Sequence, residues 1–124
     1  HMNITILTKE NTCVHNFKHT LQTKLNTSIT IINNIQLYDN NSILILFFSM
    51  NDAYSYYALK THCELYDSML SNNAFLVGFR LNTNNTYSEL KHGDIVLQHY
   101  LNIPIFIVYE DYVPPSFLYT LLKI

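Results

Sequence analysis

The chain has 124 residues, of which 48% are hydrophobic, and this composition fits one folded domain with a sizeable core and excludes a disordered protein. Its formal net charge is -2, and its lysines and arginines are spread along the chain, so we expect no nucleic-acid-binding surface. The longest apolar run, Ile43–Phe48, is far shorter than the roughly 20 residues that a membrane span needs.

His1 and Met2 have the form of a cloning remnant, so we predict a single domain over residues 3–124. Asn, Ile and Tyr are abundant while Gly and Pro are scarce, which indicates an A+T-rich coding sequence such as that of some viral genomes. No signal peptide is recognisable, so we expect an intracellular protein, although the sequence does not name its compartment.

Hydrophobic periodicity predicts strands that alternate with helices along most of the chain. Thr8 or Asn11 can cap the first helix. The next helix carries an apolar stripe that includes Tyr54, Tyr57 and Leu65. In chain order we predict a strand at 3–7, a helix with Val14, Phe17, Leu21 and Leu25 on its buried face, an extended segment at 29–32, a strand at 43–48, a helix from 54 to about 72, a strand at 75–79, a helix near 90–101, a strand at 103–109 and a short helix from 115. Such alternation predicts an α/β fold with helices on both faces of the sheet.

The turn after the strand Ile43–Phe48 is the most informative feature of the chain. It reads Ser49-Met50-Asn51-Asp52-Ala53-Tyr54-Ser55 and leads into the long helix. A parallel strand brings such a turn to the carboxyl edge of the sheet, where free helix N–H groups face ligands. The turn has no cysteine, histidine, lysine or glycine, so it is poor in reactive groups. Asp52 also suits the plain structural role of a helix cap.

The pattern from Ile43 to Glu110 resembles the thioredoxin fold family. In that family a strand leads into a C-x-x-C motif, which opens a long helix, and a later strand begins with a cis-proline that faces the motif. Asp52-Ala53-Tyr54-Ser55 stands where C-x-x-C would be, and Ile103-Pro104-Ile105 resembles the proline strand. The resemblance implies a thioredoxin-like three-layer α/β sandwich with a central mixed sheet, and a cis bond before Pro104.

The chain departs from this family at the positions that carry its chemistry. Both motif cysteines are absent, Leu46 replaces the buried acid, and the flanking tryptophans are missing. Disulfide exchange needs a thiolate and a resolving thiol, and Cys13 and Cys63 are better interpreted as small buried hydrophobes. We therefore predict a redox-inactive domain with no enzymatic activity and no cofactor.

Two histidines have a spacing that is found in zinc sites. His15 and His19 are four residues apart and share one helical face, but Asn16 stands where a zinc protease has its catalytic glutamate. A solvated helix face explains this pair better, and we predict no metal site.

Tyrosine is the side chain that the turn does offer. Tyr54, Tyr56 and Tyr57 cannot all be buried at helical spacing, so at least one should be exposed, where it can contact a protein. In the thioredoxin family the groove beside the cis-proline binds extended peptides. We therefore predict a protein-interaction or assembly module for a protein or extended-peptide partner. The predicted partner-binding residues are Met50, Asn51, Asp52, Tyr54, Ser55, Tyr57, Ile103, Pro104 and Tyr109.

Two alternatives remain open. One is a small flavodoxin-like α/β domain that binds a nucleotide or phosphorylated ligand at the turn Ser49–Ser55, although Asp52 would repel an anion there. The other is a homodimer in which the apolar tail Phe117–Ile124 packs against a second copy.

Overall fold

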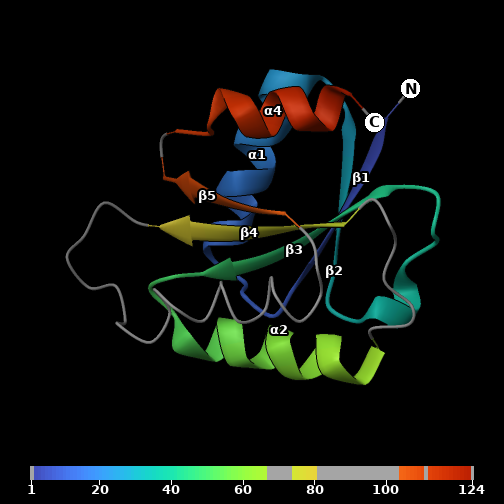
Figure 1. Cartoon of the computed structure of the whole chain (residues 1–124), viewed down its shortest axis with the longest axis vertical. Coiled ribbons are helices and arrows are strands. Elements are labelled where there is room, and N and C mark those ends of the chain that lie inside the picture. The colour runs from blue at the N-terminus through green and yellow to red at the C-terminus, as the bar shows by residue number, and fades with distance from the viewer. Residues whose placement is uncertain (1, 67–73, 81–103, 111, 124) are drawn as a thin grey trace.

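In the computed structural model, which describes residues 2–66, 74–80, 104–110 and 112–123, five strands form one sheet between two layers of helices (Figure 1). The alternation of strands and helices confirms the predicted α/β class. The predicted helix near 90–101 and the residue Ile103 lie outside the described residues. The described elements are β1 Asn3–Thr8, α1 Cys13–Leu25, β2 Ser28–Ile32, the 3-10 helix η1 Ile35–Leu37, β3 Ile43–Ser49, α2 Ala53–Tyr66, β4 Ala74–Arg80, β5 Ile105–Tyr109 and α4 Pro115–Leu122.

The sheet has the strand order β2-β1-β3-β4-β5, and each strand runs parallel to its neighbours. The mixed sheet that the thioredoxin resemblance implied is therefore wrong for the described strands. Because neighbouring strands are parallel, each connection must run back over one face of the sheet from the carboxyl edge to the amino edge. Helices α1 and α2 make two of these connections. The order also changes direction at β1, since the chain moves from β1 to one side for β2 and to the other side for β3.

The central strand β3 is buried at all of its positions, Ile43–Ser49. It lies between β1 and β4, and helices cover both faces of the sheet at this point (Figure 1). A strand in this place needs apolar side chains on both faces, which explains its unbroken apolar run. The run itself is therefore a sign of burial.

Two layers of core side chains cover the two faces of the sheet. On one face α1 and α4 bring Phe17 and Phe117 against the sheet, and the ring of Phe17 lies 5.1 Å from that of Phe47 and 6.4 Å from that of Phe117. On the other face α2 brings Tyr56 and Leu59 against the sheet. Figure 1 shows α1 and α4 together on one side and α2 on the other.

One face of the apolar tail packs within the chain, while the other face is exposed. Phe117 and Leu121 in α4 are fully buried, while Tyr119 and Leu122 are each 61% exposed. Helix α4 begins with Pro115, whose fixed backbone angle suits a first helical position. The tail thus completes the core over α1, and the homodimer stays a prediction.

Candidate functional site

Glu10, in the turn between β1 and α1, closes the N-terminus of α1. Its carboxylate accepts hydrogen bonds from the backbone N–H groups of Thr12, Cys13 and Val14 at 2.6, 2.7 and 2.7 Å. The side chain is only 7% exposed. These bonds satisfy the free donors of the helix end and place a negative charge at its positive end. Therefore, the N-terminus of α1 is already occupied by a carboxylate of the chain.

This cap differs from the one that the sequence predicted. We expected Thr8 or Asn11, but the Thr8 hydroxyl instead donates to the carbonyl of Phe47 and accepts from the N–H of Glu10, both at 2.9 Å. A glutamate side chain is long enough to fold back over the first turn and reach several N–H groups at once. Thr8 lies before the helix, and its hydroxyl links the β1–α1 turn to β3.

The turn between β3 and α2 is closed by Ser55. Its buried hydroxyl accepts from the N–H of Ser49 at 3.0 Å and donates to the carbonyl of Asp52 at 2.7 Å. The N–H of Met50 donates to the carbonyl of Phe79 in β4 at 2.7 Å. Met50 is 6% exposed, and its sulfur would lie 3.4 Å from a Cβ placed on Gly78. Two of the predicted partner-binding residues, Met50 and Ser55, thus lie inside the turn.

The remaining residues of the predicted site are divided between the two edges of the sheet. Ser49 pairs with Phe79, and Tyr109 pairs with Arg80, so Tyr109 lies at the same carboxyl edge of the sheet as the turn. Pro104 precedes β5 and lies at the opposite, amino edge because β5 is parallel to β4. Tyr109 therefore shares the carboxyl edge with the turn, although β4 lies between their strands, whereas Pro104 lies at the far end of β5. The bond between Ile103 and Pro104 lies outside the described residues.

Both thiols are held in the protonated form. Burial raises the pKa of Cys63 from its ordinary 9.0 to about 12, and burial together with the nearby Glu10 carboxylate raises the pKa of Cys13. Cys13 packs with α1 on one face of the sheet, whereas Cys63 lies in the core of the other face. Thiolates are the reactive form of cysteine, so these thiols are poor nucleophiles at neutral pH.

Helix α2 has two apolar faces. Tyr56, Leu59 and Cys63 face the sheet and are at most 2% exposed. The stripe that the sequence analysis traced lies on the outside instead, where Tyr54, Tyr57 and Leu65 are 72%, 47% and 71% exposed. These three residues, with Ala58 and Thr61, are called the tyrosine face below. The prediction that at least one tyrosine of this helix is exposed is confirmed.

A cavity of about 440 Å³ runs along the tyrosine face. Its walls also include Lys9, from the turn after β1, and His62, whose Nε2 accepts a hydrogen bond from the N–H of Ile35 at 2.8 Å. Burial lowers the pKa of His62, and the nearby Lys9 lowers it further, so the imidazole is kept neutral as an acceptor. This bond joins η1 to α2 beside the cavity.

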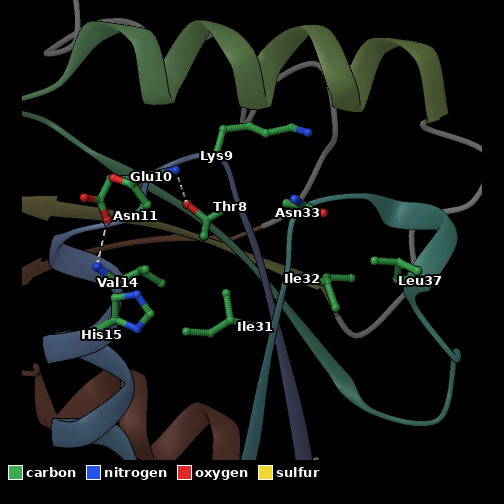
Figure 2. Close-up of a pocket in the computed structure, with 10 residues that line it drawn as sticks. All are labelled: Thr8, Lys9, Glu10, Asn11, Val14, His15, Ile31, Ile32, Asn33 and Leu37. Carbon is green, nitrogen blue, oxygen red and sulfur yellow. Dashed lines mark hydrogen bonds between the residues drawn. The ribbon is translucent and has the colours of Figure 1, made fainter.

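A second cavity, also of about 440 Å³, lies at the carboxyl edge beside β1 and β2, and is called the edge cavity below (Figure 2). Lys9 lines both cavities. Lys9, Asn33 and Leu37 were not among the site residues predicted from the sequence. The signal that could have found them is that residues directly after parallel strands meet at the same edge of the sheet. The residues that line the edge cavity are Thr8, Lys9, Glu10, Asn11, Val14, His15, Ile31, Ile32, Asn33 and Leu37.

Among the described residues, no group of three or more histidines, cysteines and carboxylates is arranged to hold a metal ion. His19 lies exposed on α1, and His15, also exposed, lines the edge cavity. No helix in the described part of the chain has the length and apolar character that crossing a bilayer requires.

No protein-family model and no curated protein matches this chain. The fold and the surfaces together define a class only, an α/β domain with a parallel sheet in which the β1–α1 and β3–α2 turns are closed by their own side chains.

Proposed function

We propose that this chain is a protein-binding domain without catalytic activity, and that the tyrosine face of α2 is its contact surface. The observation that carries the proposal is the exposure of Tyr54, Tyr57 and Leu65 on a helix whose opposite face already fills the core. An exposed apolar stripe of this kind is typical of a surface that meets another protein. A partner would cover it by packing apolar side chains along the helix.

The spacing of the tyrosine face suits a long, narrow contact. From residue 54 to residue 65 the helix rises by roughly 16 Å, at 1.5 Å per residue. Tyrosine contributes a large contact area and a hydroxyl at a low cost in side-chain entropy, and it is enriched among residues that dominate binding energy. Lys9, beside the same cavity, adds a positive charge that a carboxylate of the partner could meet.

Three observations support a non-catalytic role. The β3–α2 turn has its hydroxyl and backbone groups joined to one another, the N-terminus of α1 is capped by Glu10, and both thiols have raised pKa values. The thioredoxin resemblance stays a prediction within this proposal. Its peptide groove does not supply the contact surface proposed here, because Pro104 lies at the other edge of the sheet.

The strand order favours a second candidate, the flavodoxin-like ligand-binding domain. The order β2-β1-β3-β4-β5 with parallel strands is the one found in that class. The turn Ser49–Ser55, which this alternative gave as the ligand site, is a poor place for a phosphorylated ligand because the N–H groups of residues 49–52 bond within the chain. A ligand in this candidate would need another place at the carboxyl edge.

Comparative capture from cells of the source organism tests the proposal. We expect the double variant Tyr54→Ala/Tyr57→Ala to lose at least one protein that the wild type retains, by about 30-fold if the two tyrosines together contribute some 2 kcal/mol. Tyr119→Ala is the matched control, because Tyr119 is equally exposed but lies on α4. Asp52→Ala tests the turn. Loss with Asp52→Ala and none with the tyrosine variant would contradict the proposal.

A further inference from the structure

The edge cavity lies where the connections of the sheet diverge. From β1 the chain turns into α1 on one face of the sheet, and from β2 it continues through η1 beside the opposite face (Figure 1). The start of α1, the end of β2 and η1 all contribute to its walls. In open α/β sheets, ligands bind in the crevice outside the carboxyl ends of the strands, where the strand order reverses. The edge cavity lies beside that point.

One side of the cavity is apolar. Ile32 at the end of β2 and Leu37 in η1 line it, and Leu37 is 65% exposed at its rim (Figure 2). Ile31 points to the other face of β2 and lines the wall near Val14 and His15. Small-molecule sites typically have volumes of about 300 to 1,000 Å³ with mostly apolar walls and a few polar groups. The volume of about 440 Å³ suits a ligand with a compact aromatic or branched apolar body.

The polar side of the cavity carries a positive charge. Lys9 is half-buried, and the ion pair found among the described residues is the one between Lys60 and Glu64, so Lys9 has no carboxylate partner there. The Glu10 carboxylate also borders the cavity, but it is engaged with three N–H groups of α1. In Figure 2 the Lys9 side chain extends over the side of the cavity where Asn33 lies. An anionic group could meet the Lys9 ammonium there.

The same geometry distinguishes between anions. A phosphate is usually held by several backbone N–H groups at a helix N-terminus, and here Glu10 occupies those groups on α1. The Glu10 carboxylate would also repel a dianion more strongly than a monoanion. A carboxylate carries one charge, which one lysine balances, and the side-chain amides of Asn11 and Asn33 can supply neutral hydrogen bonds. We propose that the edge cavity binds a small organic monocarboxylic acid, with Lys9 holding the carboxylate and with Ile32 and Leu37 contacting the apolar body.

Three probes of similar shape test this proposal on the full chain: 3-phenylpropionate, 3-phenylpropanamide and 3-phenylpropylamine. Inorganic phosphate is added as a separate anion probe. Titrations followed by two-dimensional amide NMR report both affinity and location. We expect the acid to shift the resonances of Lys9, Asn33 and Leu37, and to bind about tenfold more tightly than the amide, as a charge-assisted hydrogen bond predicts. The amine and phosphate should bind more weakly still.

Variants assign the preference to one side chain. Lys9→Gln should reduce the acid's affinity about tenfold and remove its advantage over the amide, and Lys9→Arg should keep most of that advantage. Lys24→Gln, at the exposed last turn of α1, is the matched control and should change neither. Four outcomes would each overturn the proposal. They are equal affinity for the acid and the amide, resonance shifts at residues away from the edge cavity, an equal loss of affinity with Lys24→Gln, and no binding by any probe. None of these outcomes depends on whether the tyrosine face binds a protein.

Discussion

The β3–α2 turn and the tyrosine face begin within a few residues of each other, yet they differ in how their groups are satisfied. In the turn, Ser55 is buried and its hydroxyl bridges Ser49 and Asp52. On the tyrosine face, Tyr54 and Leu65 are each more than 70% exposed. The turn occupies the position that open α/β sheets use for chemistry, but the surface beside it is the one left available. A position in a fold indicates a site only where its groups remain free to bind.

The largest effect should come from a substitution on the face of α2 that packs against the sheet, compared with one on the tyrosine face. Tyr56→Ala removes a ring that is 2% exposed and packs 5.2 Å from the ring of Phe48, so we expect unfolding to become easier by about 3 to 4 kcal/mol. Tyr54→Ala, two residues away, should change the free energy of unfolding by less than about 0.5 kcal/mol. Urea denaturation measures both. Similar losses for the two variants would show that the tyrosine face is part of the core.

A change at Glu10 tests whether the carboxylate of this residue caps the N-terminus of α1. Glu10→Ala leaves the N–H groups of Thr12, Cys13 and Val14 without their acceptor, and we expect a loss of about 2 to 3 kcal/mol in the free energy of unfolding. Glu64→Ala is the control, since its pairing with Lys60 is exposed and should contribute below about 0.5 kcal/mol. A loss at Glu10 no larger than the control would contradict the cap.

The buried thiol of Cys63 predicts a pH dependence. Its pKa is about 12 in the folded chain against an ordinary 9.0, so the folded state holds its proton when the unfolded state has lost it. This contribution is fully present below pH 9 and declines as the pH rises towards 12. Between pH 8 and pH 10.5 the wild type should lose about 2 kcal/mol more than Cys63→Ala. Parallel stability curves for the two proteins would show that the thiol is not buried.

The smallest effect on the free energy of unfolding is expected at the β3–α2 turn. Ser55→Ala removes the buried bridge between Ser49 and Asp52, and we expect a loss of about 1 to 2 kcal/mol from the free energy of unfolding. Ser116→Ala, at an exposed position of α4, is the control and should have almost no effect. If Ser55→Ala were neutral in urea denaturation, the turn would not be closed by its hydroxyl.

The sequence was sufficient for the α/β class but not for the direction of the strands. The apolar run Ile43–Phe48 indicates burial on both faces, and such a run reads the same whether its neighbours are parallel or antiparallel. Direction depends on which edge each connection returns to. The mixed sheet and the position of Pro104 beside the turn were both implied by the thioredoxin resemblance, and the strand directions differ from it on both points.

The candidate site was predictable in part for a similar reason. Helical spacing alone requires that Tyr54, Tyr56 and Tyr57 cannot all be buried, and this expectation is confirmed. Two apolar stripes lie on opposite faces of α2, however, and periodicity does not say which one faces the sheet. Lys9 and Leu37 come from separate segments, and only the strand order brings them to one cavity.

Site-specific photo-crosslinking tests the central claim that the tyrosine face, and not the β3–α2 turn, meets the partner. The photoreactive phenylalanine analogue p-benzoylphenylalanine would replace Tyr57 in one variant and Asn51 in another, and adducts formed in the source cells would be compared. The account predicts a discrete protein adduct from position 57 and none from position 51. An adduct from position 51 with none from position 57 would contradict it.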